Sequence, residues 1–184
     1  MVAEHGYHDA TITQIAAAAG VSRRTFYSYF FSKEECFFDT YDVIANHLRE
    51  LARTAASERA EWPDQARARI AATLEFFSSN PDLARFCLIA PTRAGDKIAA
   101  RYGQAVAEVY DELIEGTPEA VTARAPSPAV QQSMIGGMAA LVIDKVERGE
   151  GEQLGELLPD LLELFLSPYL GREEAVRMAG RSSS

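Results

Sequence analysis

The sequence has few of the residues that support metal, redox or nucleotide chemistry. Its two cysteines, Cys36 and Cys87, lie far apart and lack the paired spacing of a zinc site or a disulfide framework. We interpret both as small buried apolar residues. His5, His8 and His47 form no metal-binding motif, and no glycine-rich phosphate loop is present. We therefore expect neither a metal nor a cofactor.

Long apolar runs and an excess of basic residues are missing as well. No stretch reaches the roughly eighteen apolar residues of a membrane span. The first residues, MVAEHGYHD, have no apolar signal core, so we expect a cytoplasmic protein. Lys and Arg total 18 against 27 Asp and Glu, which gives a formal net charge of −9. Such a field repels nucleic acid at long range, so contact with DNA would require a local basic patch.

The segment TITQIAAAAGVSRRTFYSYFFSKEE, residues 11–35, contains three signals for the start of a helix. A T-x-x-Q capping box begins at Thr11, a capping serine stands at Ser22, and an S-x-x-E capping box begins at Ser32. Gly20 can adopt the left-handed conformation that ends the first helix. The spacing predicts a helix, a tight turn, a second short helix and then a third helix.

The second short helix has two different faces. Phe26 and Phe30 are one turn apart and, with Val21, form the expected inward set. The remaining residues face outward: Arg23, Arg24, Thr25, Tyr27, Ser28 and Tyr29. No carboxylate occurs between Ser22 and Lys33. Singly, these side chains could be an ordinary solvated face, and Tyr27 could pack on the third helix. Together they favour a helix-turn-helix that presents hydrogen-bond donors to the major groove of DNA.

The ordered elements TITQIA, AGVS, TFYSYF and SKEE, within residues 6–42, resemble the DNA-binding region of the TetR family of one-component transcriptional regulators. The resemblance implies an all-α fold with a helix-turn-helix DNA-binding domain over residues 1–43. A helical ligand-binding and dimerisation domain would follow over residues 44–173, and a flexible tail over 174–184. The resemblance also implies DNA contacts from Thr11, Thr13, Arg23, Arg24, Thr25, Tyr27, Ser28, Tyr29 and Lys33.

The sequence departs from the family pattern at its beginning. In TetR-like proteins the segment similar to VAEHGY closes a longer first helix that packs across the helix-turn-helix. We therefore expect the natural start to lie upstream of Met1. An alternative function follows from the same observation: a ligand-binding or scaffold helical dimer that has lost DNA binding.

From Ser32 onward, apolar residues recur only at helical spacing, and no β pattern of useful length occurs. A long helix should follow Ser32, and another should run from Pro63 to the stop signal at Asn80. Further helices are expected over 92–115, from Pro128 onward and over 153–170. Residues 116–128, GTPEAVTARAPSP, are rich in proline and small residues and predict a loop.

The last two predicted helices have wide apolar surfaces that favour pairing with a second copy, as in a four-helix interface. The resemblance implies the same homodimer. The candidate interface residues are Met138, Leu141, Val142, Leu158, Leu161, Leu162, Phe165 and Tyr169. Alternatively, about half of these side chains would fill the core of one protomer.

The resemblance further implies a small-molecule effector held by the central helices. Candidate lining residues are Trp62, Phe77, Phe86, Cys87, Tyr102, Tyr110, Gln131 and Met134. Their largely aromatic and aliphatic character predicts an apolar or amphipathic effector, although aromatic residues at helical spacing are more often core residues than pocket residues. No acid, base or nucleophile set has motif-like spacing, so we do not expect an enzyme. We expect a bacterial repressor that binds a palindromic DNA operator as a homodimer.

Overall fold

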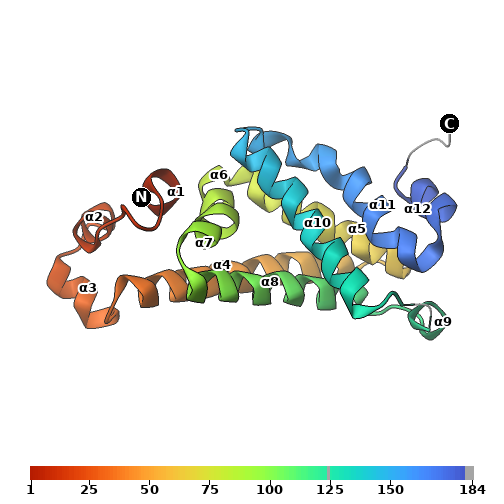
Figure 1. Ribbon diagram of the computed structural model, residues 1–184, viewed down its shortest axis with the longest axis horizontal. Coiled ribbons are helices and arrows are strands. Elements are labelled where there is room, and N and C mark those ends of the chain that lie inside the picture. The colour runs from red at the N-terminus through yellow and green to blue at the C-terminus, as the bar shows by residue number, and fades with distance from the viewer. Residues whose placement is uncertain (124, 181–184) are drawn as a thin grey trace.

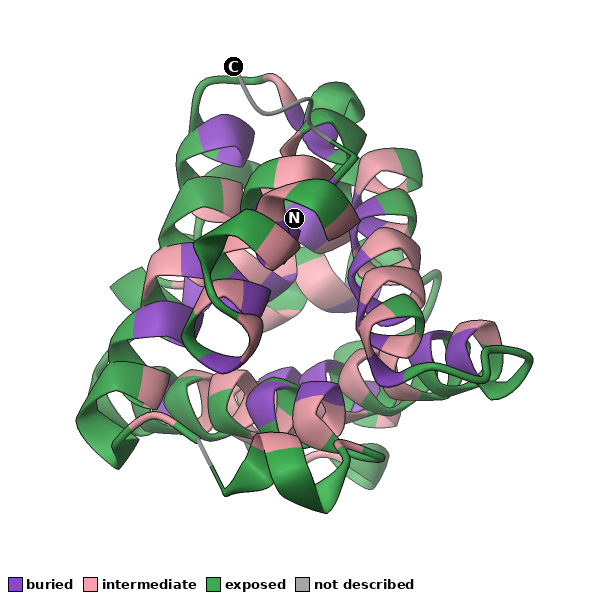
Figure 2. Cartoon of the chain, turned by 90° about the vertical axis from the view of Figure 1, so that its right-hand side faces the viewer, coloured by how far each residue is buried: buried purple, intermediate pink, exposed green. Residues whose placement is uncertain are grey.

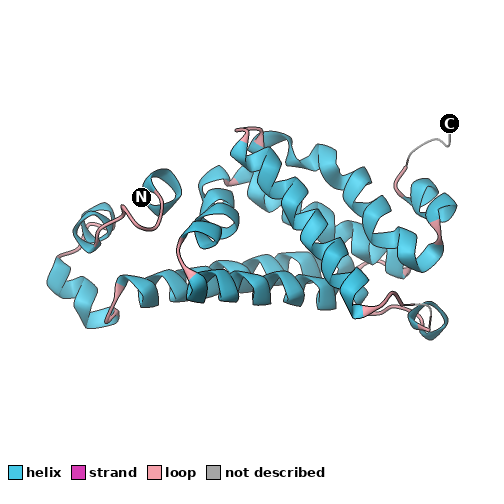
Figure 3. Ribbon diagram, in the orientation of Figure 1, coloured by secondary structure: helices cyan, strands magenta, loops and turns pink. Residues whose placement is uncertain are grey.

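The computed structural model describes residues 1–123 and 125–180, and within them the chain forms helices and no strands (Figures 1 and 3). The predicted all-α fold is confirmed. The molecule is elongated, with its first three helices at one end (Figure 1). In the described residues, no helix combines the length and the apolar character needed to span a membrane.

Three short helices form the N-terminal end: α1 (Val2–His5), α2 (Ile12–Ala18) and α3 (Arg23–Tyr29). Helix α2 contacts α3, whereas α1 packs mainly against two later turns, α6 (Pro81–Ala84) and the π-helical turn η1 (Arg85–Ile89). We call these three helices the N-terminal unit. Through α1, this unit contacts the turns over residues 81–89.

Local capping explains why α2 and α3 begin and end where they do. The Thr11 hydroxyl accepts a hydrogen bond from the Gln14 backbone N–H at 3.3 Å, and the Thr11 N–H donates to the Gln14 side-chain oxygen at 2.9 Å. Gly20 has φ 69° and makes the turn. Ser22 then caps α3. The predicted helix-turn-helix is confirmed.

Two of the three apolar residues expected to face inward from α3 and its turn do so. Phe26 is 4% exposed, and its ring centroid lies 5.3 Å from that of Phe30. Val21 was expected to join them but is 41% exposed. Because α1 packs mainly against α6 and η1, it leaves Val21 uncovered.

Helix α4 (Lys33–Ser57) leaves this N-terminal unit and runs along the lower side of the molecule in the view of Figure 1. Ser32 caps it by accepting a hydrogen bond from the Glu35 N–H at 3.0 Å. The Glu35 carboxylate accepts from the N–H of Phe31 rather than from that of Ser32, so the expected capping box closes one residue early. The expected domain boundary between residues 43 and 44 falls inside this uninterrupted helix.

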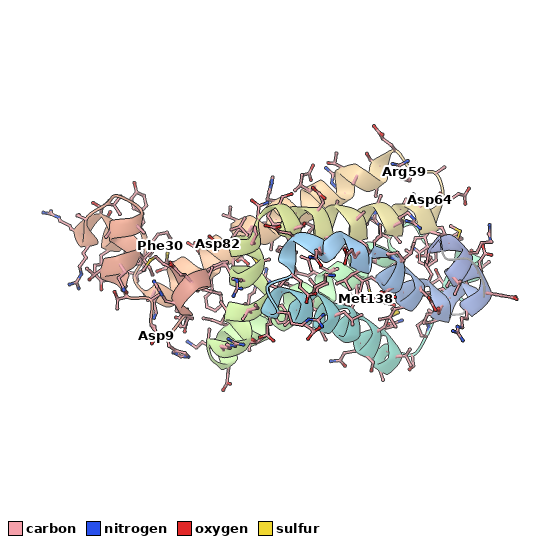
Figure 4. All side chains as sticks on the ribbon, turned by 90° about the horizontal axis from the view of Figure 1, so that it is seen from above. Asp9, Phe30, Arg59, Asp64, Asp82 and Met138 are labelled. Carbon is pink, nitrogen blue, oxygen red and sulfur yellow. The ribbon has the colours of Figure 1, made fainter. Side chains whose placement is uncertain are left out.

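Four more long helices form the body of the molecule: α5 (Trp62–Ser79), α8 (Asp96–Ile114), α10 (Pro128–Glu147) and α11 (Leu158–Leu170). Helices α5 and α8 pack on α4. Helix α5 contacts α4, α8 and α11 and is therefore central (Figure 4). Buried positions follow the inward sides of these helices (Figure 2). The largest fully buried side chains are Leu74, Pro91, Leu154, Leu162, Phe165 and Leu166.

The expectation for the dimer interface was wrong for five of its eight residues. Met138, Leu161, Leu162, Phe165 and Tyr169 are each at most 5% exposed and belong to the protomer core. Helices α10 and α11 contact each other, and α11 also packs on α5, so this apolar surface is already covered. Val142 and Leu158 are half-buried, and Leu141 is 41% exposed.

The helix expected over 92–115 begins later than predicted. Residues 90–93 form a separate turn, α7 (Ala90–Arg93), which follows η1 directly. Gly95 has φ 106° and interrupts the helix, so α8 begins at Asp96. The predicted loop over 116–128 contains one helical turn, α9 (Glu119–Thr122), and Arg124 lies outside the described residues.

The C-terminal part also differs from the expectation. The helix predicted over 153–170 consists of a 3₁₀ segment, η2 (Gly151–Leu157), followed by α11. Pro159 lies in the first turn of α11, where its missing N–H has no structural cost. The tail expected from residue 174 is incorrect up to Met178, because α12 (Arg172–Met178) packs on α11 with Ala175 fully buried. Residues 181–184 of that tail lie outside the described residues.

Replacing Phe165 should destabilise the protomer strongly. Its ring is 0% exposed and contacts Trp62 and Tyr169 at centroid distances of 5.8 and 5.7 Å. We expect Phe165→Ala to lower the free energy of unfolding by about 3–5 kcal/mol, measured by urea denaturation. Leu51 of α4, 38% exposed, provides the control. If Phe165→Ala destabilised no more than Leu51→Ala, the assignment of Phe165 to the core would be wrong.

Candidate functional site

Helix α3 presents an exposed cationic and aromatic face at the end of the molecule. Arg23 and Arg24 are exposed in its first turn. Tyr27 and Tyr29 are 45% and 75% exposed. Because no carboxylate lies between Ser22 and Lys33 in the sequence, this face is positive within an acidic protein. Guanidinium groups in this setting can grip guanine O6 and N7 or a phosphate.

The two small hydroxyl residues of α3 are partly engaged within the helix. The Thr25 and Ser22 hydroxyl oxygens lie 2.9 Å apart, and the Ser28 hydroxyl donates to the Thr25 carbonyl at 2.6 Å. Each hydroxyl oxygen can still accept a hydrogen bond through its lone pairs. Its proton, however, is already donated or shared within the helix and its cap. The arginines and tyrosines are therefore better placed than Thr25 and Ser28 to contact DNA.

Thr11 and Thr13 lie at the N-terminus of α2, as expected, and both are exposed. The Thr11 hydroxyl is 2.7 Å from the Gln14 side-chain oxygen and so completes the cap. Thr13 is one residue inside the helix. Free backbone N–H groups at a helix N-terminus favour phosphate, which places Thr13 close to a suitable anion position.

Lys33 has a different role from the expected phosphate contact. Its ammonium donates to the backbone carbonyls of Tyr7, His8 and Ala10 at 2.7, 3.3 and 2.9 Å. It also lies over the Tyr7 ring, 4.4 Å from the centroid. An ammonium has three donors, so none remains for DNA. Lys33 instead fixes the segment that joins α1 to α2.

A second candidate site lies inside the helical body. We call it the inner cavity, and its volume is about 160 Å³. Helices α4, α5, α8 and α10 supply most of its wall. The main lining residues are Tyr41, Ile44, Leu48, Ile70, Leu74, Phe77, Cys87, Leu88, Tyr102, Val106, Val109, Ile135, Met138 and Val142. This wall is almost entirely apolar and would hold a hydrocarbon group.

The charged residues at the edge of the inner cavity are paired with one another. Arg49 lies 2.7 Å from a Glu108 oxygen and 2.9 Å from a Glu112 oxygen. Arg69 pairs with Glu115 at 3.1 Å. Burial raises the pKa of Glu112, and Arg49 opposes that shift. These cations are neutralised by their partners and so offer little to a ligand carboxylate.

Burial also keeps the cavity's thiol and one of its phenols neutral. It raises the pKa of the Cys87 thiol to about 12, so this sulfur is not a thiolate at neutral pH. Burial likewise raises the pKa of Tyr41. Both groups therefore present uncharged surfaces to the cavity.

A larger hollow, which we call the outer groove, lies between α8 and α10 and has a volume of about 540 Å³. Gly103, Ala107, Gly136 and Ala140 leave space between the two helices. Its polar lining residues are Asp111, Gln131, Gln132, Tyr102 and Tyr110. The Tyr110 hydroxyl already shares a hydrogen bond with that of Tyr169, because the two oxygens lie 2.5 Å apart and either can donate.

The two hollows contain five of the eight predicted pocket residues. Phe77 and Cys87 line the inner cavity, Tyr110 and Gln131 line the outer groove, and Tyr102 lines both. The structure places the other three elsewhere: Trp62, Phe86 and Met134.

Each of those three has another packing partner or a core position. The Trp62 indole N–H donates to the Leu113 carbonyl at 2.8 Å, which fixes the ring in the core. The Phe86 ring packs on Phe37 with centroids 4.6 Å apart. Met134 is 5% exposed and belongs to the protomer core.

Sequence reasoning missed the contribution of α4 to the inner cavity. Tyr41, Ile44 and Leu48 form part of its wall. Their helical spacing was visible as an apolar stripe, but a stripe does not distinguish a cavity wall from a packed core. The distinction depends on the volume left between helices that are distant in sequence.

Comparison with known proteins supports the interpretation of the N-terminal unit. The family described as "Bacterial regulatory proteins, tetR family" matches residues 1–40, which include α1, α2 and α3. This matched region contains the capped helix-turn-helix and its exposed arginines. Over these residues the chain is similar to the TetR family of bacterial regulatory proteins.

Two solved structures share the fold over most of this chain. One is the fatty acid degradation regulator FadR from Bacillus halodurans, with 19% identity. The other is the transcriptional regulator FadR from Bacillus subtilis in complex with stearoyl-CoA, with 18% identity. In each case the match covers 92% of both chains, with a TM-score of 0.77. The alternative of a scaffold that has lost DNA binding is not favoured, because residues 1–40 match a family of bacterial regulatory proteins.

Removing the Lys33 ammonium should loosen the segment that joins α1 to α2. We expect Lys33→Met to lose charge-assisted bonds to three carbonyls and to weaken the segment by about 1–3 kcal/mol. Hydrogen exchange at residues 7–11 should accelerate accordingly. The control is Lys97→Met, because Lys97 is 77% exposed and pairs only with Glu34.

The salt dependence of DNA affinity distinguishes this structural role of Lys33 from a phosphate contact. For Lys33→Met we expect the salt dependence of DNA affinity to keep its slope. A slope reduced by about 0.9, as for one lost phosphate contact, with exchange unchanged, would show that Lys33 binds DNA.

Proposed function

We propose that this protein is a ligand-responsive repressor of the TetR family that binds a palindromic operator as a homodimer. The observation that carries the proposal is the exposed, carboxylate-free face of α3, with Arg23 and Arg24 in a capped helix-turn-helix. An operator-bound dimer can repress simply by blocking polymerase. The formal charge of −9 makes this local face, rather than the whole surface, the DNA contact.

In this proposal each part of the face has a separate role. Arg23 and Arg24 lie in the first turn of α3, the part of a recognition helix that reaches base edges in the major groove. Thr11 and Thr13, at the start of α2, would bind phosphate and fix the orientation of α3. Tyr29, 75% exposed, is positioned to contact the backbone or a thymine methyl.

The homodimer is proposed from apolar residues that remain uncovered on α10 and α11. Leu141 is 41% exposed and Leu164 is 38% exposed. Gly137 lies beside Leu164, since a Cβ built on this glycine would be 3.8 Å from a Leu164 methyl carbon. A two-fold contact through this patch would pair identical α3 helices, which explains the expected palindrome.

The effector is proposed to contain a hydrocarbon chain held in the inner cavity. The wall is apolar, and its charged edge is neutralised by the Arg49 pairs with Glu108 and Glu112. FadR from Bacillus subtilis, which shares the fold, was solved with stearoyl-CoA. We therefore propose an acyl thioester as the effector class for this protein.

Occupation of the inner cavity can influence the N-terminal unit through two elements. Tyr41 and Leu48 of α4 line the cavity, and the same helix begins next to α3. The π-helical turn η1 places Cys87 at the cavity, while its Phe86 packs on Phe37. An effector that fits one arrangement of α4 and η1 better than another would shift the spacing of the two α3 helices.

Capture of genomic DNA tests the DNA-binding part of the proposal. Sheared bacterial DNA recovered with the protein should be enriched in a palindrome. Arg23→Gln and Arg24→Gln should each weaken operator binding by roughly 5- to 150-fold if the arginine grips a base edge. Arg59→Gln is the control, because Arg59 lies beyond the other end of α4 (Figure 4). Equal binding by all three variants would exclude α3 as the reading helix.

Charged substitutions in the exposed patch test the homodimer. We expect Leu141→Asp and Leu164→Asp to convert a dimer into a monomer of 20.2 kDa at micromolar concentration, measured by sedimentation velocity. Burying an unpaired carboxylate opposes association, whereas each protomer should remain folded. The matched control is Leu51→Asp, since Leu51 on α4 is also 38% exposed. Dimers that persist in both α10 and α11 variants would place the interface elsewhere.

A further inference from the structure

The inner cavity and the outer groove share one wall. Four residues line both: Tyr102 and Val106 from α8, and Ile135 and Ala139 from α10. A ligand that occupied both hollows would therefore pass between α8 and α10 at these four side chains. The inner cavity, at about 160 Å³, is smaller than a typical small-molecule site of roughly 300–1,000 Å³. The groove, at about 540 Å³, supplies the missing space.

The hydroxyl group of Tyr102 is buried at this wall without a hydrogen-bond partner. Among the residues that the structure describes, only one other buried side-chain atom lacks a hydrogen-bond partner, Nη1 of Arg101. That atom lies 3.7 Å from a Glu108 oxygen, and Arg101 lines neither hollow. A buried hydroxyl that bonds to nothing costs free energy, so native structures usually satisfy it. Tyr110, on the same helix, shows the usual situation with its bond to Tyr169.

The surroundings of Tyr102 determine what kind of group could bind to it. Burial raises the pKa of Tyr102, so its hydroxyl remains a neutral hydrogen-bond donor. Cys87 and Tyr41, which also line the inner cavity, are kept neutral by burial. Arg49 is already paired with two glutamates. An uncharged oxygen acceptor suits this position, whereas a carboxylate would be buried without a free cation.

We propose that the Tyr102 hydroxyl donates a hydrogen bond to an uncharged carbonyl of the effector at the wall between the inner cavity and the outer groove. The hydrocarbon chain then lies in the inner cavity, and the polar remainder of the molecule extends along the groove. This inference rests on the acyl effector proposed above and assigns the residue that recognises its carbonyl. Tyr102 would thus distinguish an acyl thioester from an alkyl compound of the same length.

Two probes that differ only at the carbonyl test this role. Dodecanoyl-CoA has the thioester carbonyl, and S-dodecyl-CoA has a methylene group in its place. We expect the wild-type protein to bind dodecanoyl-CoA about 2- to 10-fold more tightly, as one hydrogen bond contributes. Tyr102→Phe should bind the two probes equally. Calorimetry on the full chain measures both affinities.

Thermal unfolding without ligand separates recognition from a structural role. Tyr102→Phe removes a hydroxyl that has no partner, so its Tm should equal or exceed that of the wild type. The matched control is Tyr169→Phe, which removes a hydroxyl bonded to Tyr110. That control should lower the Tm and retain the preference for the thioester.

Three results would overturn the inference. A preference for dodecanoyl-CoA that survives in Tyr102→Phe would show that another group binds the carbonyl. Equal binding of the two probes by the wild type would show that the carbonyl is not recognised. If neither probe bound the wild-type protein, the acyl effector itself would be wrong, and the role of Tyr102 would fall with it.

Discussion

The arrangement of both functional sites depends on the continuity of α4. This helix runs without interruption from Lys33 to Ser57, which corresponds to about 37 Å at 1.5 Å per residue. Its first turn holds the N-terminal unit, because Lys33 binds three carbonyls of the segment before α2. Its middle turns provide Tyr41 and Leu48 to the inner cavity. Because α4 is a rigid helix that carries both contacts, a shift of α4 at the inner cavity also shifts its first turn at the N-terminal unit.

The features predictable from sequence were those that a few neighbouring residues decide. The capping box of Thr11 and Gln14, the left-handed Gly20 and the cap at Ser22 are all local, and they fixed the helix-turn-helix. The predicted start of the helix over 92–115 was wrong because a local signal had been overlooked. Gly95 has a positive φ and stands directly before α8. Such signals act within one helical turn and need no knowledge of the fold.

The features that sequence reasoning missed are contacts between distant residues. Lys33 was expected to bind phosphate, yet carbonyls more than twenty residues earlier occupy its donors. Phe165 and Leu162 have the same apolar spacing as an interface, but α11 turns them toward α5. Phe86 has the composition of a pocket residue and packs on Phe37 instead. Burial in a core, an interface or a cavity wall selects the same residue types, so composition alone cannot separate them.

The seam between α4 and α8 contains a group of linked ion pairs, and this matters for movement. Arg101 lies 2.7 Å from Asp42 and 3.7 Å from Glu108, and Arg49 joins Glu108 to Glu112. Partly exposed ion pairs of this kind contribute little to stability, typically about 0–1 kcal/mol each. They can exchange partners more cheaply than a packed apolar core can rearrange. A ligand that enlarges the inner cavity beside this seam would therefore meet less resistance between α4 and α8 than between α4 and α5, which pack on each other extensively.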